Sequence, residues 1–217
     1  MKILVHGDSS KSFFQLDDIR EKYLADEYHT NDNIDVLSPW YCELTALHYV
    51  LKNYPDDVVG IEQYRRYLLD KNATGPIGKE EIELLLRKYD IICGYNEYTT
   101  GYIYLWPVQH GYGPCFELFL DVLREKFGQQ MFLHFKEYLF GNWHCHGNLM
   151  IAKRNLLIDY MVFLNSMFRF MRPRIFNIHE CPRMIEYISE FFLGAWLTFY
   201  RKKIYFAPWM NINTAVN

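Results

Sequence analysis

The stretch Tyr41-Cys42-Glu43-Leu44-Thr45-Ala46-Leu47, followed by Val58-Val59-Gly60-Ile61-Glu62-Gln63-Tyr64-Arg65-Arg66-Tyr67, decides the fold expected for this chain. In its second part, an apolar and β-prone run ends at two adjacent arginines. Open α/β sheets bind ligands at the carboxyl ends of their strands, and guanidinium groups match the geometry of phosphate. The pair therefore predicts an anion site at a strand end. The alternative is a solvated arginine pair beside an edge strand.

Length and composition predict one globular domain over residues 1–217. The chain is 50% hydrophobic and 23% charged, which is close to ordinary globular values. Its net charge of −3 excludes a general basic field for nucleic acid, so any phosphate binding must be local. The 18% of aromatic residues exceed what core filling requires. They are typical of a carbohydrate or nucleobase site, an aromatic core or a partner surface.

Cysteine usage and hydropathy predict a cytoplasmic protein. The five cysteines are odd in number and contain no CxxC pair, which is typical of a reducing compartment. Met1 leads directly into the β-prone run Lys2 to Val5, without the features of a signal peptide. No apolar run reaches the roughly 18 residues that a membrane span needs. A peripheral contact with the inner face of the plasma membrane stays open.

Hydrophobic periodicity and turn residues predict alternating strands and helices. Strands are expected at Lys2 to Val5, Val58 to Ile61, Asp90 to Cys93, Leu149 to Ala152 and Ile204 to Pro208. Helices are expected at Phe14 to Tyr28, Tyr41 to Asn53, Lys79 to Lys88, Cys115 to Phe127, Gln130 to Phe140, Leu156 to Phe170 and Arg183 to Tyr200. This order favours a layered α/β fold.

Three irregular segments complete this pattern. Ser38 and Pro39 are expected to open the second helix, as its N-cap and first helical residue. The segment Tyr95 to Pro114 is expected to form a long loop that contributes a lip for the acceptor. Arg172-Pro173-Arg174 is expected to break the chain between two helices.

Several runs of residues along the chain resemble a known family. Asp32-Asn33-Ile34, Tyr41 to Leu47, Lys52-Asn53 and Gly60 to Tyr67 are similar to the signature of a bacterial glycosyltransferase family. That family is catalogued as a domain of unknown function and is associated with capsular and exopolysaccharide synthesis. The resemblance continues at Asn148 to Ile151 and at Arg183 to Glu190, so it covers most of the chain.

The resemblance implies a GT-A-like single-domain nucleotide-sugar fold, with a central, mostly parallel sheet flanked by helices. It implies an inverting transfer of a hexose from a nucleotide diphosphate-sugar to a growing, lipid-linked surface glycan of a capsule, exopolysaccharide or O-antigen. UDP-linked donors, UDP-galactofuranose among them, fit this expectation. The implied donor residues are His6, Gly7, Asn33, Tyr41, Glu43, Thr45, Glu62, Gln63, Tyr64, Arg65 and Arg66. Residues His146, Asn148 and Arg183 are implied to contact the acceptor or the sugar.

Glu190 is the expected catalytic base, because an inverting transferase needs a carboxylate to take the proton from the acceptor hydroxyl. Glu186, one helical turn earlier on the same face, is the alternative base. Without the resemblance, Glu190 would be interpreted as a surface carboxylate in an ion pair. Glu43 and Thr45 stand two apart on a helix, so only one of them is expected to reach the ligand.

The chain departs from the family pattern at residues that bear on a metal. Gln63 replaces the family's histidine, and Glu62 stands alone where GT-A enzymes carry Asp-x-Asp for Mn²⁺ or Mg²⁺. Metal dependence is therefore in doubt. The run His144-Cys145-His146 invites a zinc reading, but no second ligand pair at the spacing of a structural site accompanies it.

Two other functions remain open. Gln63, together with Phe191 in place of the family's arginine, favours a catalytically lapsed paralogue that acts as a binding or scaffolding subunit. A nucleotide-sugar hydrolase that uses the same arginines would turn over the donor whatever the acceptor. Activity that depends on an acceptor glycan would exclude the hydrolase.

Overall fold

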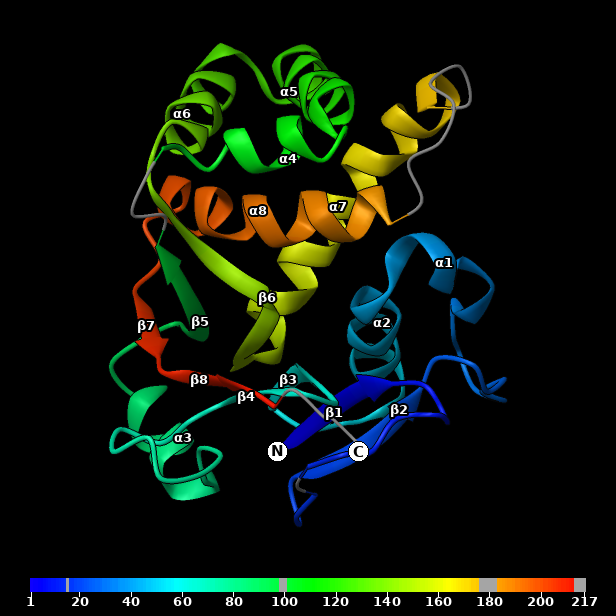
Figure 1. Cartoon of the computed structure of the whole chain (residues 1–217), viewed down its shortest axis with the longest axis vertical. Helices are drawn as coiled ribbons and strands as arrows, with labels where there is room; N and C mark the ends of the chain where they lie inside the picture. Colours follow the sequence, from blue (N-terminus) through cyan, green and yellow to red (C-terminus); the bar gives the residue numbers. More distant parts are fainter. Residues whose placement is uncertain (15, 98–100, 176–182, 213–217) are drawn as a thin grey trace.

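A mixed sheet runs through the centre of the computed structural model, which describes residues 1–14, 16–97, 101–175 and 183–212 (Figure 1). Its main path follows the order β2-β1-β3-β6-β5-β7. These strands are β2 (Arg20–Leu24), β1 (Lys2–Gly7), β3 (Val58–Gln63), β6 (Trp143–Lys153), β5 (Ile91–Glu97) and β7 (Ile204–Ala207). A short antiparallel ribbon, β4 (Arg66–Leu68) with β8 (Trp209–Asn211), branches off β3.

Strand directions confirm the expected sheet. Strand β1 is parallel to both β2 and β3, and β5 is parallel to β7. Strand β6 pairs antiparallel with both β3 and β5, so it is the reversed strand of the main path. The result is the central, mostly parallel sheet flanked by helices that the sequence predicts, and the carboxyl ends of β1 and β3 lie side by side.

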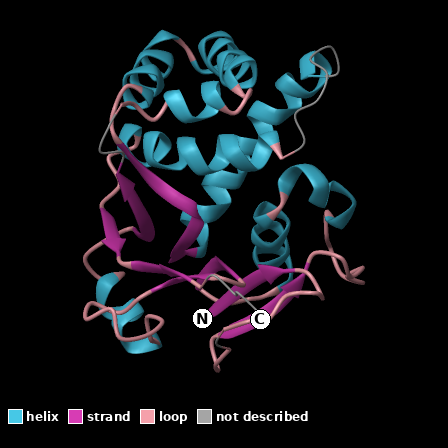
Figure 2. Cartoon of the chain, viewed as in Figure 1, coloured by secondary structure: helices cyan, strands magenta, loops and turns pink. Residues whose placement is uncertain are grey.

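Helices cover the sheet in two unequal layers (Figure 2). The described helices are α1 (Ser38–Tyr41), α2 (Glu43–Asn53), α3 (Lys79–Leu85), α4 (Leu105–Gln109), α5 (Gly113–Phe127), α6 (Gln129–Leu139), α7 (Arg154–Ile175) and α8 (Met184–Phe199), with a 3-10 turn at Asp35–Leu37. Helix α2 packs on β1 and β3, α8 packs on β6, and α5 and α6 pack above α8.

Alternation along the strands divides the core between the two faces. Leu4 of β1 and Met150 of β6 belong to the large cluster under α2 and α5 to α8. Ile3 and Ile151, their neighbours in sequence, belong to a smaller cluster with Ile82 of α3. Because successive strand residues point to opposite faces, this period of two gives both helical layers an apolar surface. The sheet is therefore buried on both sides, as a mostly parallel sheet requires.

The helix expected at Phe14 to Tyr28 is wrong. Within its described part, the Asp17 carboxylate accepts hydrogen bonds from the backbone N–H groups of Ile19 and Arg20, which forms a turn. The chain then continues as β2, where Arg20 and Tyr23 are both buried, on opposite faces of the sheet. Their three-residue separation satisfies helical spacing, so periodicity alone did not distinguish the two structures.

Two further boundaries differ from the sequence expectation. Ser38 does not cap the second helix; α1 ends after one turn at Cys42, whose φ of 43° redirects the chain before α2 begins. The break expected at Arg172-Pro173-Arg174 is wrong, because α7 continues to Ile175. Pro173 lies in the last turn of that helix, so the one hydrogen bond that its missing N–H removes is near the end of the ladder.

Secondary structure also occupies part of the segment expected to be a loop. Strand β5 extends to Glu97, and α4 begins at Leu105; residues 98–100 lie outside the described part of the chain.

Within the described residues, no helix is both long and apolar enough to cross a membrane.

Candidate functional site

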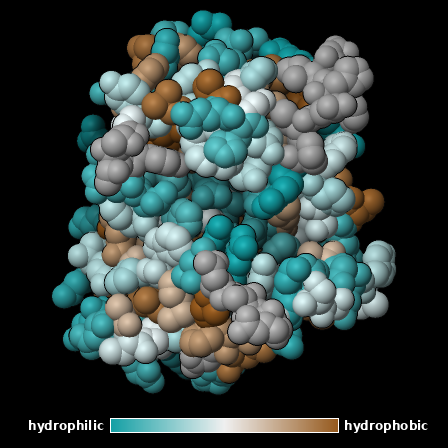
Figure 3. Space-filling model, viewed as in Figure 1, coloured by the Kyte–Doolittle hydropathy of each residue, from teal (hydrophilic) through white to brown (hydrophobic). Residues whose placement is uncertain are grey.

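A pocket of about 530 Å³ opens where β1 and β3 end. Gly7 ends β1 and Gln63 ends β3, and the opposite wall comes from the first turn of α2, from β6 and from the first half of α8. Figure 3 shows hydrophilic residues gathered across the middle of the face between the helical layer and the sheet. The volume lies within the range of small-molecule sites, and strand ends are where α/β sheets bind ligands.

The pocket brings together most of the residues that the sequence singles out. From the donor set it contains His6, Gly7, Glu43, Gln63, Tyr64, Arg65 and Arg66. From the catalytic and acceptor sets it contains His146, Arg183, Glu186 and Glu190. Glu43 lines the pocket while Thr45 does not, in line with their different directions on α2.

Arg65 and Arg66 lie at the tight turn between β3 and β4. Gln63 pairs with Arg66 across this turn, and the backbone N–H of Tyr64 donates to the carbonyl of His6 over 2.8 Å, which joins the turn to β1. The Nε atoms of both arginines are buried without a hydrogen-bond partner among the described residues. Guanidinium groups match the geometry of phosphate, so two of them with unused donors at a strand end have the chemistry that an anion requires.

Gln63 links Arg66 to the first turn of α2. Its amide nitrogen donates to Glu43 Oε1 over 2.7 Å and to the carbonyl of Gly147 over 2.8 Å. Its amide oxygen accepts a hydrogen bond from Arg66 Nη1 over 3.1 Å. A Cβ at Gly147 would lie 3.3 Å from that same Nη1, so a residue without a side chain suits this close approach. The amide thus fixes the positions of a cation and a carboxyl group.

Helix α8 begins with an ion pair that faces the pocket. Arg183 has a left-handed backbone with φ of 66°, and its guanidinium donates to both oxygens of Glu186 over 2.6 and 2.7 Å. Glu186 is almost fully buried, whereas half of the Arg183 side chain is exposed. The bidentate contact neutralises Glu186 and occupies both of its oxygens, which weakens it as a catalytic base.

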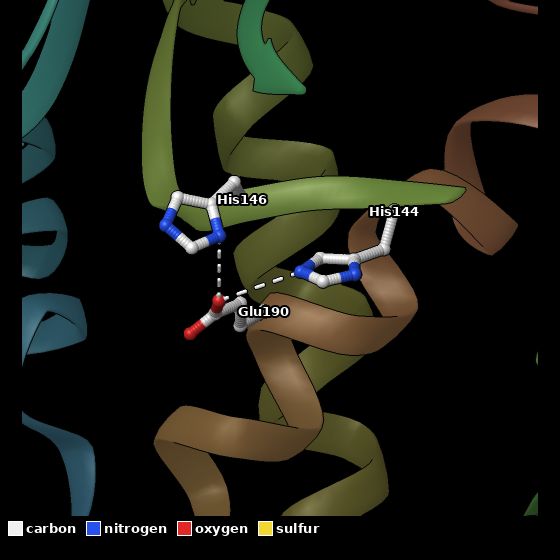
Figure 4. Close-up of side chains that lie close together, drawn as sticks. All are labelled: His144, His146 and Glu190. Atoms are coloured by element: carbon white, nitrogen blue, oxygen red, sulfur yellow. Dashed lines mark ion pairs between the residues drawn. The ribbon is translucent and has the colours of Figure 1, made fainter. Parts of the chain in front are cut away.

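Glu190, one turn further along α8, contacts two histidines of β6 (Figure 4). Its Oε1 lies 3.7 Å from His144 Nε2 and 3.6 Å from His146 Nδ1, and it accepts the backbone N–H of Gly147 over 2.8 Å. His144 and His146 are two residues apart on a strand, so both rings point to the same face. Phe191 packs against the first ring and Trp209 against the second, which fixes both imidazoles.

The pKa values of two carboxyl groups in the pocket are shifted in opposite directions. Burial, followed by the charge of Glu186, raises the pKa of Glu43 well above its usual range. In contrast, the pKa of Glu190 is lowered: burial alone would raise it, but His144, His146 and the Gly147 N–H outweigh that effect. Glu190 is therefore ionised at neutral pH, and Glu43 favours its neutral form. Such a difference between the pKa values of neighbouring titratable groups is typical of active sites.

His6 adds a neutral ring at the end of β1. Burial lowers the pKa of His6 to about 4. Its Nε2 atom is buried and has no hydrogen-bond partner among the described residues. At neutral pH this imidazole can give or accept one hydrogen bond without bringing charge into the pocket.

The structure does not bring the remaining predicted residues to the pocket. Asn33 bonds to the carbonyls of His29 and Asn31 in a turn, because its short amide side chain satisfies local backbone groups. The Tyr41 ring packs edge-on against Phe168, 5.7 Å between centroids.

Thr45, Glu62 and Asn148 have structural partners instead of a place in the pocket. Thr45 Oγ1 donates to the Cys42 carbonyl over 2.6 Å at the start of α2. Glu62, expected to bind the donor and standing where GT-A enzymes commonly bind a metal, is fully buried in an ion pair with Arg20. Asn148 accepts a hydrogen bond from Ser189 Oγ over 3.1 Å, which joins β6 to α8.

Several pocket residues escaped the sequence prediction of site residues. Asp8, Lys11 and Ala25 lie beyond the ends of β1 and β2, Cys42 precedes α2, and the opposite wall adds Asn96, Trp106, His144, Tyr187 and Phe191. The spacing of His144 and His146 was the one signal in the sequence. Their partner Glu190 lies more than forty residues away, so only the fold brings the three together.

Two groups of described residues have ligand atoms close enough to hold a metal ion: His144, His146 and Glu190, and Cys42, Glu43 and Glu186. The second group fits a cation poorly, because Arg183 already binds both oxygens of Glu186. The first group, with two imidazoles and one carboxylate, suits a transition metal better than Mg²⁺, which prefers oxygen ligands.

Comparisons with known proteins identify the family of this chain and a solved structure with a similar fold. The family model described as Domain of unknown function (DUF4422) matches residues 6–202, so the chain belongs to that family. The apo structure of WbbM, a bifunctional glycosyltransferase, superposes with a TM-score of 0.75 at 16% sequence identity. The match covers 98% of this chain and 45% of the WbbM chain, so this chain spans less than half of that protein. The likeness shows a shared fold. No curated protein matches the chain.

Proposed function

We propose that this member of the DUF4422 family is a single-domain, GT-A-like glycosyltransferase that moves a hexose from a nucleotide diphosphate-sugar to a growing bacterial surface polysaccharide. UDP-linked hexoses, including UDP-galactofuranose, are the proposed donors, and a lipid-linked glycan at the inner face of the membrane is the proposed acceptor. The fold shared with a bifunctional glycosyltransferase supports the reaction class. The observation that carries the proposal is a single pocket that combines an ionised carboxylate with two arginines whose Nε atoms have no hydrogen-bond partner among the described residues.

In this proposal, Arg65 and Arg66 bind the diphosphate of the donor. When the bond between the anomeric carbon and the phosphate oxygen breaks, the electron pair leaves with the nucleoside diphosphate. The guanidinium groups stabilise the negative charge that develops there. Lys11, which lines the same end of the pocket, adds a further positive charge.

Glu190 accepts the proton of the acceptor hydroxyl as the oxygen attacks the anomeric carbon from the opposite side, which inverts the configuration. Gly147 and the two imidazoles fix Glu190 Oε1, and the second carboxylate oxygen can receive the proton. Glu186 is the weaker choice of base, because Arg183 binds both of its oxygens.

A metal and the base would compete for Glu190, since the better group of potential ligands contains it. We assign Glu190 to proton transfer because Arg65, Arg66 and Lys11 can supply positive charge to the diphosphate. Glu62 stands where GT-A enzymes carry Asp-x-Asp for a metal, but here its charge is paired with that of Arg20. Transfer is therefore expected to proceed with Mn²⁺ and Mg²⁺ removed by a chelator.

The test is a product assay with UDP-hexoses and surface-glycan fragments as acceptors, in which UDP release and glycoside formation are both measured. A transferase releases UDP in step with a new glycoside. UDP release that is independent of acceptor would instead identify a nucleotide-sugar hydrolase. Binding of the donor with no turnover would favour the lapsed paralogue.

A further inference from the structure

One buried carboxyl oxygen in the pocket lacks a partner. Glu43, at the start of α2, is only 6% exposed. Gln63 donates to its Oε1 over 2.7 Å, but Oε2 is buried and receives no hydrogen bond from the described residues. Leaving a buried polar atom unsatisfied costs about 1–3 kcal/mol, so such atoms usually have a partner or a functional role. Because Glu43 lines the pocket, a bound ligand can supply that partner.

The surroundings of Glu43 favour a neutral carboxyl group. Glu186 and Glu190 are the charged groups that raise its pKa, and Arg183 opposes them. That guanidinium is engaged by both oxygens of Glu186, and no salt bridge joins Glu43 to a cation among the described residues. A buried carboxyl without a cation partner keeps its proton more readily. In a protonated Glu43 whose Oε1 accepts from Gln63, the proton lies on Oε2, which can then donate a hydrogen bond.

Two hydrogen bonds in series connect Glu43 to Arg66, at the proposed phosphate site. Arg66 donates to Gln63, and Gln63 donates to Glu43, so Glu43 is two hydrogen bonds away from the proposed phosphate site. Glu190, the proposed base, contributes to its electrostatic environment from α8. In an inverting transfer, the anomeric carbon lies between the phosphate oxygen that leaves and the acceptor oxygen that attacks, so the sugar is bound between the diphosphate and the base. Glu43 is linked to the proposed phosphate site through Gln63 and is close enough to the proposed base to feel its charge, which puts Glu43 beside the sugar in this proposal.

We propose that Glu43 selects the transferred sugar by donating a hydrogen bond from Oε2 to one of its hydroxyl oxygens. This inference rests on the proposed function, because it assumes that the pocket binds a nucleotide diphosphate-sugar. It adds a substrate class: donors whose sugar carries a hydroxyl at that position are preferred over the matching deoxy sugars. Sites built to hydrogen-bond a hydroxyl reject analogues that lack it, because a buried polar group is then left unpaired.

The experiment is calorimetric titration of the full chain with UDP, with UDP-galactose in its pyranose and furanose forms, and with deoxy derivatives of both. Glu43→Leu removes the hydrogen bond, whereas Glu43→Gln keeps an acceptor for Gln63 and a donor for the ligand. Leu47→Val is the matched control, since Leu47 is buried on the same helix and does not line the pocket. Thermal unfolding of each variant checks that it folds.

We expect Glu43→Leu to bind UDP within about threefold of the unsubstituted protein and the UDP-sugar roughly tenfold or more weakly. Glu43→Gln and Leu47→Val should bind both within about threefold. One deoxy donor should bind the unsubstituted protein about tenfold more weakly than its parent, and Glu43→Leu should abolish that difference.

The inference is overturned if Glu43→Leu weakens UDP and UDP-sugar equally, or weakens neither. It is also overturned if Glu43→Gln loses as much sugar affinity as Glu43→Leu, because a donor would then not be what matters. If the leucine variant does not fold, the titrations of the unsubstituted protein are the test. Equal affinity of that protein for all deoxy donors and their parents contradicts the inference. Failure of the unsubstituted protein to bind any of these nucleotides would instead reject the proposed function, and the inference with it.

Discussion

Glu62 and Glu43 are both buried glutamates near the carboxyl end of β3, but their surroundings differ. Glu62 accepts hydrogen bonds from Arg20 Nε over 2.7 Å and from the Leu68 N–H over 3.0 Å. The Arg20 guanidinium also donates to Asp17 and to the Ile77 carbonyl. In the pocket, by contrast, Glu43 Oε2 and the Nε atoms of two arginines have no hydrogen-bond partner among the described residues.

The comparison separates buried polar groups that have partners inside the protein from buried polar atoms that lack them and can bind a ligand. The Arg20–Glu62 pair connects β2, β3 and β4, and its atoms gain nothing from a ligand. The pocket contains buried polar atoms that have no internal hydrogen-bond partner among the described residues, which costs stability and is typical of functional sites. Substitutions in the first region should therefore change unfolding, and those in the second should change binding and catalysis.

The largest expected effect is on stability, at the Arg20–Glu62 pair. Arg20→Leu would leave Glu62 buried without a cation, and breaking one partner of a buried ion pair typically costs about 3–5 kcal/mol. Urea unfolding should show a loss of that size. The double variant Arg20→Leu/Glu62→Leu should recover much of it, since no buried charge remains. A single variant within about 1 kcal/mol of the unsubstituted protein would contradict the structural role.

Glu190→Gln tests the pocket side of the comparison. The amide keeps the size of the side chain but cannot accept the proton of the hydroxyl, so transfer should fall by about 100-fold or more. Affinity for the UDP-sugar and the unfolding midpoint should change little. Steady-state transfer rates and calorimetry on the same preparation make the measurement. A fully active Glu190→Gln protein would move the base to Glu186 or another residue.

Arg65→Ala and Arg66→Ala should each weaken UDP binding by about 1.5–3 kcal/mol, the range for a hydrogen bond to a charged group. Arg87→Ala on the surface beyond α3 is the control, because it lies outside the pocket. Titration with UDP at a fixed ionic strength measures the change. Unchanged affinity in both pocket variants would remove the arginines from the site.

A smaller effect is expected in the pH dependence of stability. Burial lowers the pKa of His146 from 6.5 to about 4. Between these values the unfolded chain binds a proton that the folded chain does not, so stability falls as the pH falls from about 6.5 to 4. His146 should contribute up to about 2 kcal/mol of this loss by pH 5. His146→Gln, which cannot titrate, should show a flatter decline; a parallel decline would contradict a buried, neutral His146.

The sequence predicted much of the sheet, because β-prone runs such as Val58 to Ile61 stand between clear turn residues. It also predicted that Arg65 and Arg66 would follow a strand, and the strand end places them in the pocket. The helix at Phe14 to Tyr28 failed because the inward direction of Arg20 is set by Glu62, a residue 42 positions away. Local periodicity carries no information on such a partner.

The candidate site was predictable where a motif is local and not where the fold assembles it. Glu190 followed from the family resemblance, but His144 was not among the expected site residues, and the strand that carries it was expected to begin only at Leu149. Strand β6 begins at Trp143, so both histidines belong to it and face α8. Glu62 and Asn148 are polar residues that the sequence placed in the site. In the structure both are buried, and each has a hydrogen-bond partner far away in the sequence.

The most direct test of the account is a thermal-shift and calorimetric screen of the full chain against UDP, GDP, CMP and their common sugar conjugates, with and without Mn²⁺. We predict that a nucleoside diphosphate and its sugar conjugate raise the unfolding midpoint without Mn²⁺, and that Arg66→Ala removes this stabilisation. No stabilisation by any nucleotide in either condition would contradict a nucleotide-sugar site in the pocket.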